Sequence, residues 1–398
     1  MAALMGNNKN IAVIGFTGTI NRCLVTHYLQ EVGSELAINI DDTEIHVFTR
    51  DHTSFSTDSN MNIHFYPGYS ITDVAGENEK EENTERMLLL FKTLRISRVF
   101  ICLPQSLSST DMVVISNAFT DKILLSSGTV KTVVRISSYG LDNDFPTQGP
   151  LALAHKASEE YMRSKGLTVT SIRPTSFFSN FMKYDVASIM ENSAFFSPLG
   201  YTATVNWIDN EDIAEVAAHC LLDTTLDGRI LEITGPECNS FSAKEMSKMI
   251  SEVIGKCILY GEISLPTFSA DYEELWKYLR SDGFNVVTNT LKEVIGRDGH
   301  RFRDMPIFST LAEHSRLEVK FNEMTSELKN YEDRLILESE NATIEVEDMK
   351  ERIRVLQEKR STALVKDASS DNDKYQECMD EIDQIVGEFN RLNDTLGR

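Results

Sequence analysis

Short apolar runs alternate with longer amphipathic segments over the first three quarters of the chain. The apolar runs are typical of buried strands, and they fall at residues 11–14, 45–48, 62–65, 98–103, 130–138 and 167–172. Helical patterns lie between several of these runs, at residues 20–32, 85–94, 109–125 and 151–164. Strands that alternate with helices indicate right-handed crossovers and a parallel sheet covered on both faces. The pattern therefore predicts a doubly wound α/β domain.

A different pattern begins near residue 308. Apolar residues recur there at alternating steps of four and three, which is the period of a coiled-coil seam: Leu317, Phe321, Met324, Leu328, Tyr331 and Leu335. The seam resumes over 342–356, and a second amphipathic run at 375–396 follows a polar stretch at 366–373 that favours a turn. All nine prolines lie at or before Pro306. We therefore expect a C-terminal α-helical coiled-coil tail over 309–398.

These patterns divide the chain into a two-lobed domain and a tail. We expect a dinucleotide-type half over about 1–175 and a smaller α/β substrate lobe over about 176–308, which together form one domain over 1–308. The tail at 309–398 has three possible arrangements: a hairpin within the chain, a seam for self-association, or a docking site for another protein. The sequence leaves all three open.

Charge and cysteine usage narrow the classes of partner. The 398 residues carry a formal net charge of -22, which disfavours nucleic acid and anionic membrane surfaces as partners. No apolar run is long enough for a membrane span, and the first ten residues lack the pattern of a secretory signal. The six cysteines are scattered singly, which argues against a zinc site and against a disulfide scaffold. We therefore expect a cytoplasmic protein without a metal.

The turn after the first strand carries two glycines of a dinucleotide-binding fingerprint. It runs from Gly15 to Asn21, with Gly15 at the tight turn and Gly18 where backbone must approach a pyrophosphate. The residues that would hold the phosphates through the start of the following helix are Thr17, Thr19 and Ile20. Asn21 replaces the third glycine of the fingerprint, and we expect the turn to tolerate it. The pattern predicts a Rossmann fold.

The end of the second strand favours NADP as the cofactor. Thr49 and Arg50 stand where an acidic residue would bind the ribose of NAD, and an arginine there can accept a 2′-phosphate. Asp51, one residue later, keeps NAD as an alternative. The simplest other interpretation of Arg50 is an exposed arginine at a strand end.

From residue 11 to about 308 the chain resembles the NmrA-like branch of atypical short-chain dehydrogenases. The resemblance rests on ordered motifs, namely Gly15–Gly18, Val47–Arg50, Val134–Gly140, His155–Glu159, Ser164–Pro174, Trp207–Asp212 and Gly228–Pro236. It implies an NAD(P)-binding fold. That branch includes NADP-dependent quinone and imine reductases and also redox-sensing regulators that are not catalysts.

The candidate catalytic residues are Lys156 and Ser138. The residue four positions before Lys156 is Ala152, so the tyrosine–lysine dyad of ordinary short-chain dehydrogenases is absent. The resemblance implies that Lys156 contacts the cofactor ribose or assists protonation; the alternative is a surface lysine paired with Glu160 at i+4. The alternative interpretation of Ser138 is a residue that caps the end of a strand.

Three further residues complete the predicted site. Ser137 lies beside Ser138 at the end of a strand, where the ligand crevice of an open α/β sheet begins. Pro104 and Gln105 follow the fourth strand and would line the nicotinamide side of the crevice. We count Ser137, Pro104 and Gln105 among the cofactor-binding residues.

Three functions follow as hypotheses. The first is an NADP-dependent oxidoreductase acting on a small organic substrate such as a quinone or an imine. The second is an NADP-sensing regulator without turnover. The third is an inactive scaffold that has lost NADP and joins a larger assembly through 309–398. Gly15, Gly18, Arg50 and Lys156 favour the first; the absent tyrosine and the tail favour the others.

Overall fold

The computed structural model describes most of the chain. The described residues are 10–15, 18–38, 43–50, 62–76, 79–142, 149–265, 269–335, 347–355, 384, 385, 387, 388 and 391. The chain divides into two compact units. The first comprises Met1–Phe181, Phe196–Glu245 and Tyr260–Phe302, and the second comprises Met182–Phe195, Met246–Leu259 and Arg303–Arg398.

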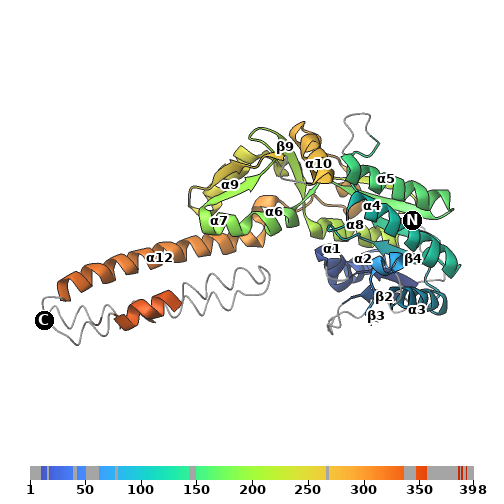
Figure 1. Cartoon of the computed structure of the whole chain (residues 1–398), viewed down its shortest axis with the longest axis horizontal. Helices are drawn as coiled ribbons and strands as arrows, with labels where there is room; N and C mark the ends of the chain where they lie inside the picture. Colours follow the sequence, from blue (N-terminus) through green and yellow to red (C-terminus); the bar gives the residue numbers. More distant parts are fainter. Residues whose placement is uncertain are drawn as a thin grey trace. The chain divides into compact units, whose positions relative to one another are not determined.

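The first unit is built on a seven-stranded parallel sheet (Figure 1). Its strand order is β10-β6-β5-β4-β1-β2-β3, and every pairing in it is parallel. The strands are β1 (Asn10–Ile14), β2 (Glu44–Thr49), β3 (Asn62–Pro67), β4 (Arg98–Ile101), β5 (Thr132–Ile136), β6 (Thr168–Pro174) and β10 (Ile230–Ile233). The order and direction of the strands confirm the predicted Rossmann-type fold.

Helices cover both faces of this sheet. Alternate residues of β1 point to opposite faces: Ile11 and Val13 belong to one apolar cluster, and Ala12 and Ile14 to the other. The helices on the first face are α1 (Thr19–Cys23), η1 (Leu24–Tyr28), α2 (Leu29–Glu35) and α8 (Asn210–Leu222). Those on the second face are α3 (Glu79–Thr93), α4 (Ser109–Phe119), η4 (Thr120–Leu125) and α5 (Gly149–Ser164).

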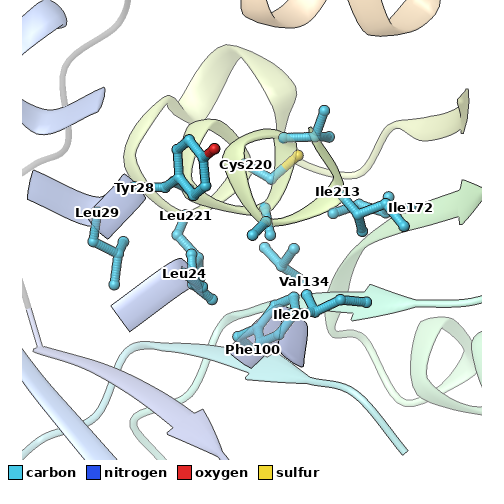
Figure 2. Close-up of a cluster of buried hydrophobic side chains, with 14 of the residues drawn as sticks. Ile20, Leu24, Tyr28, Leu29, Phe100, Val134, Ile172, Ile213, Cys220 and Leu221 are labelled. Atoms are coloured by element: carbon cyan, nitrogen blue, oxygen red, sulfur yellow. The ribbon is translucent and has the colours of Figure 1, made fainter. Parts of the chain in front are cut away.

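The first of these two cores joins α8 to the sheet. Figure 2 shows Ile213, Cys220 and Leu221 of α8 opposite Ile20, Leu24 and other side chains of the first helices and of β4, β5 and β6. Every one of these five side chains is at least 96% buried. Burial of such side chains stabilises the fold by roughly 1.5–3 kcal/mol each. The first helix is therefore held firmly behind the turn at Gly15–Gly18.

A pair of histidines occupies the edge of the sheet. His46 on β2 lies in register with His64 on β3, and their rings stack at 5.3 Å. The Nδ1 atom of buried His46 is 3.2 Å from the hydroxyl of Tyr66. Burial, together with the neighbouring His64, lowers the pKa of His46 to about 4.

We expect the free energy of unfolding to fall by about 1–2 kcal/mol between pH 7 and pH 5 because of His46. The unfolded histidine binds a proton below about pH 6.5, whereas the folded one does so only near the lower pKa of about 4. Acid therefore favours the unfolded state. Urea unfolding of wild type and His46→Gln at both pH values tests this: an equally steep pH dependence in the variant contradicts the assignment.

Smaller sheets and helices follow β6 in the chain, and they belong partly to the first unit and partly to the second. A three-stranded sheet has the order β11-β9-β7, with β7 (Ser176–Phe177), β9 (Thr204–Ile208) and β11 (Ser240–Ser242). A two-stranded sheet pairs β8 (Ala194–Ser197) with β12 (Leu259–Glu262). The remaining helices up to residue 304 are η3 (Ile71–Ala75), α6 (Phe178–Tyr184), α7 (Val186–Asn192), η5 (Thr224–Leu226), η6 (Glu237–Asn239), α9 (Ala243–Ile254), α10 (Ala270–Arg280), α11 (Thr290–Ile295) and η8 (Phe302–Asp304).

The tail begins with a helix of 30 residues, α12 (Pro306–Leu335). Leu317, Phe321, Met324 and Leu328 of the predicted seam are buried on it, as are Met349 and Ile353 in the helical stretch 347–355. The guanidinium of Arg352 pairs with Glu388 at 2.6 Å. The polar turn at 366–373 lies outside the described residues. A helical start to the tail is confirmed, and its coiled-coil pairing stays a prediction.

Within the described part of the chain, every helix is too short or too polar to cross a membrane.

Candidate functional site

The strand order places a candidate crevice beside β1. The chain proceeds from β1 to β2 on one side, and β4 adjoins β1 on the other, so the topology reverses between β1 and β4. Ligands of open α/β sheets bind outside the carboxyl ends of the strands at such a point. The turn after β1, Arg50 after β2, the loop 102–108 after β4 and the loop 137–142 after β5 all begin at this edge.

Gly15 and Gly18 are the described residues of the turn after β1, and the first helix starts directly behind them. Gly15 has a φ of +87°, and its amide donates to the carbonyl of Phe48 at 2.7 Å. Gly18 precedes α1 in an extended conformation, and no side chain among the described residues caps the helix. The first intrahelical bond runs from the amide of Arg22 to the carbonyl of Gly18, so the amides of Thr19 and Ile20 have no acceptor within the helix. Such a terminus attracts anions.

Ile20 and Thr17 are the two predicted phosphate-binding residues whose side chains give no support to the site. The side chain of Ile20 is buried in the core, so only its backbone amide is available to a ligand. Thr17 lies outside the described residues. The terminus therefore offers a site through its backbone.

Asn21 fastens this turn to the strand. Its side-chain amide donates to the carbonyl of Ile14 at 2.8 Å and to that of Gly15 at 2.8 Å. The residue is 3% exposed and sits inside α1. The structure thus gives Asn21 a defined role where the sequence predicted only a tolerated replacement of glycine.

We expect Asn21→Ala to lower the free energy of unfolding by about 1–2 kcal/mol, because two carbonyls of the turn lose their donor. Affinity for an anionic ligand at the helix start should fall with it. Urea denaturation and calorimetry with NADPH measure the two effects. Thr26→Ala is the control, since the hydroxyl of Thr26 donates an exposed hydrogen bond to the carbonyl of Arg22, four residues earlier. Equal losses in the two variants would remove the special role of Asn21.

Arg50 stands at the end of β2, beside β1 in the sheet. The preceding Thr49 is buried and its carbonyl accepts from the amide of Tyr69 at 3.0 Å. The Arg50 side chain is exposed, and among the described residues it has no ion pair or hydrogen bond. Asp51 lies outside them. The exposed guanidinium therefore stands at the end of β2, at the crevice edge.

The loop after β4 is held by two helices from later in the chain. The side-chain amide of Gln105 donates to Asn180 of α6 at 2.9 Å, and the carbonyl of Gln105 accepts from the hydroxyl of Tyr272 at 3.1 Å. The carbonyl of Pro104 accepts from the amide of Leu107 at 3.3 Å. The sequence did not place Asn180 or Tyr272 beside this loop, because no local pattern links them to it.

The loop after β5 carries Ser137 and Ser138, and Lys156 of α5 reaches the same loop. The amide of Ser137 donates to the carbonyl of Ile172 at 2.7 Å, and Ser138 is half-buried. The Lys156 ammonium lies 3.1 Å from a carboxylate oxygen of Asp142 and donates to the carbonyl of Leu141 at 3.3 Å. Its partner is thus Asp142 of the loop, and not Glu160, which the helical spacing alone suggested.

Asp142, the partner of Lys156, also belongs to an ion network with the buried residues Arg173 and Glu159. Arg173 of β6 donates to Asp142 at 2.6 Å and to Glu159 of α5 at 2.8 Å. Arg163 donates to the same Glu159 carboxylate at 3.0 Å. Burial raises the pKa of Glu159, but the hydrogen bond from Arg173 and the positive charges of Arg173 and Arg135 outweigh it, and the pKa falls to about 2. Glu159 therefore has two arginine partners, Arg173 on β6 and Arg163 four residues later on α5.

One group of metal-ligating side chains comes together among the described residues. Asp209, Glu211 and His300 bring their ligand atoms within 4.8 Å of one another. Asp209 accepts from the amide of Glu211 at the start of α8, and it is 3.0 Å from the His300 ring. The Tyr28 hydroxyl donates to Glu211. These bonds account for the cluster as a structural junction.

The chain is similar to known proteins over the part that contains these residues. The model of the NmrA-like family matches residues 7–274. Prestalk A differentiation protein A of Dictyostelium discoideum is 33% identical over 161 residues, which is 36% of this chain and 51% of that protein. The (4-alkanoyl-5-oxo-2,5-dihydrofuran-3-yl)methyl phosphate reductase of Streptomyces griseus is 25% identical over 191 residues, which is 44% of this chain and 64% of that enzyme. Each alignment spans less than two thirds of the relative.

A solved structure has the same fold. The NADPH-dependent quinone oxidoreductase of Escherichia coli, complexed with NADPH, superposes with a TM-score of 0.58 at 16% identity. The similarity covers 76% of this chain and 99% of that one. At 16% identity, this similarity shows that the two proteins share a fold and nothing more.

Proposed function

The chain belongs to the NmrA-like family, and from that premise we propose that it is an NADPH-dependent oxidoreductase acting on a small conjugated substrate such as a quinone or an imine. The observation that carries the proposal is the open helix start that follows β1 and Gly18, together with the exposed Arg50 at the end of the neighbouring strand β2. The Streptomyces griseus relative is a reductase by name, and the similar Escherichia coli protein is by name an NADPH-dependent quinone oxidoreductase, in complex with NADPH.

The residues present fit a dinucleotide. A side chain at Gly18 would meet nothing within 4 Å, so the backbone there faces open space. Amides of Thr19 and Ile20 would bind the pyrophosphate, and Arg50 would bind the 2′-phosphate. The loops with Pro104 and Gln105 and with Ser137 and Ser138 would border the nicotinamide. When bound, NADPH supplies a hydride.

The side chains also favour a particular class of substrate. Ala152, 6% exposed, occupies the position where related dehydrogenases carry tyrosine, so no phenol stands one helical turn before Lys156. The Lys156 ammonium at the loop after β5 can hold a ribose hydroxyl or deliver a proton. Quinones accept hydride with the resulting charge delocalised, and they therefore need a weaker proton donor than simple ketones do. This supports a conjugated acceptor.

A regulator that binds NADP without turnover is the second candidate. It is favoured by Ala152 and by the engagement of Lys156 with Asp142. The two candidates share the cofactor site and differ only in chemistry.

Calorimetry with NADPH and NADH on the full-length chain tests the proposal, followed by NADPH oxidation with a panel of quinones and imines. We expect NADPH to bind at least about tenfold more tightly than NADH, because of Arg50. We also expect turnover with at least one quinone. Failure of both nucleotides to bind rejects the oxidoreductase and the regulator together. Tight NADPH binding with no turnover across the panel selects the regulator.

A further inference from the structure

We infer that helix α10 positions the loop between β4 and α4 at the substrate side of the crevice, with Asp271 and Tyr272 as positioning residues. The inference rests on the proposed function and deepens it. It assigns control of the nicotinamide end to a helix some 160 residues away from the loop that it holds.

Tyr272 fixes the middle of this loop. Its hydroxyl donates to the carbonyl of Gln105 at 3.1 Å, and the side chain of the same Gln105 donates to Asn180 at 2.9 Å. Gln105 is therefore held through its backbone by α10 and through its side chain by α6. Because both the backbone and the side chain of Gln105 are held, the loop is kept in one conformation at this residue.

Asp271 fixes the end of the loop. One carboxylate oxygen accepts from the amide of Ser109 at 2.8 Å, and the other accepts from the Ser109 hydroxyl at 3.0 Å. Ser109 is the first residue of α4, and a carboxylate at a helix N-terminus is favoured by the helix dipole. The loop thus enters α4 at a point clamped by α10.

Helix α10 is itself anchored against the loop after β5. Tyr278 packs edge-on against Phe284 at 5.8 Å, and Phe284 packs edge-on against Tyr139 of that loop at 5.8 Å. At the start of α5, Gly149 has a φ of +76°, and a Cβ there would lie 2.4 Å from the Cβ of Glu274. Helix α10 therefore contacts the elements that border both sides of the nicotinamide end.

Loosening this clamp should act on the substrate end of the crevice and spare the phosphate end. The phosphates would be held by the turn at Gly15–Gly18 and by Arg50, and none of the α10 contacts above involves those residues. A loop that samples more conformations lowers the fraction of molecules in the productive one, which affects turnover before it affects cofactor affinity.

Tyr272→Phe tests the inference, because it removes one hydroxyl and keeps the ring. Hydrogen exchange of the peptide over residues 103–111 should rise about fivefold, the effect of one net hydrogen bond. The kcat/KM for a quinone should fall by a similar factor, with NADPH affinity within about twofold of wild type. Tyr161→Phe is the matched control, since its hydroxyl donates to Asp121 at 2.7 Å at the far end of α5.

Asp271→Ala provides a second measurement, and it should raise exchange at the amide of Ser109. Unchanged exchange over 103–111 in both variants overturns the inference. So does faster exchange with unchanged kcat/KM, because the loop then has no bearing on the reaction. An effect of Tyr161→Phe as large as that of Tyr272→Phe also overturns it. Failure of the proposed function looks different: wild type then shows no NADPH binding at all.

Discussion

Replacing Arg50 with alanine should weaken NADPH binding by about 10- to 100-fold and leave NADH affinity within about twofold. The guanidinium is exposed at the end of β2, and no described residue pairs with it. A charge-assisted bond to the 2′-phosphate is therefore gained without breaking an ion pair to any residue that the structure describes. NADH lacks that phosphate, so it loses little when the arginine is removed.

Calorimetry of wild type and Arg50→Ala with both nucleotides measures this change in preference. Arg86→Ala is the matched control, because Arg86 is an exposed arginine that pairs with Glu82 within α3. A loss of NADPH affinity in the control would indicate a general charge effect, which added salt would also produce. An Arg50 variant that still prefers NADPH as strongly as wild type would remove Arg50 from the cofactor site.

Local patterns predicted the features of the fold that depend on neighbouring residues. The turn at Gly15–Gly18 and the strand end at Arg50 are short stretches next to buried strands, so their place at the crevice edge follows once the parallel sheet is recognised. Ser242 and Glu245 are a further local case, because a serine three residues before a glutamate is the sequence pattern of a capping box. The Ser242 amide donates to the Glu245 carboxylate at 2.8 Å, and the Glu245 amide donates to the Ser242 hydroxyl, which is a capping box before α9.

Side-chain contacts between segments far apart in the chain could not be predicted from the sequence. The i+4 rule offered Glu160 to Lys156, but a carboxylate on the loop after β5 takes the ammonium. Tyr272 reaches Gln105 across 167 positions of the chain, and nothing in either segment marks the other. One ionic partner of Glu159, Arg173, likewise comes from β6, whereas the other, Arg163, lies four residues later on α5, where the i+4 rule does offer it. One sequence specifies such pairs only through the complete fold.

Arg173→Met should cost about 3–5 kcal/mol of unfolding free energy at pH 7, the largest effect that we expect from a single substitution here. Arg173 is 1% exposed and bonds to Glu159, which is fully buried, and to Asp142. Methionine fills much of the same volume but leaves the buried carboxylate with fewer donors. Replacing the more exposed partner by Arg163→Met should cost about 1 kcal/mol, since water can reach that side of the pair.

The pH dependence of this loss identifies its origin. The folded pKa of Glu159 is lowered to about 2 from an ordinary value of 4.5, so the carboxylate stabilises the fold above about pH 4.5. That contribution is lost as the pH falls through the range down to about 2. Removal of Arg173 raises the folded pKa, so wild type and variant should converge in stability as the pH falls from about 5 to about 2. Urea unfolding followed by fluorescence and circular dichroism measures this. A gap that stays constant with pH would assign the loss to packing, because a cavity does not titrate.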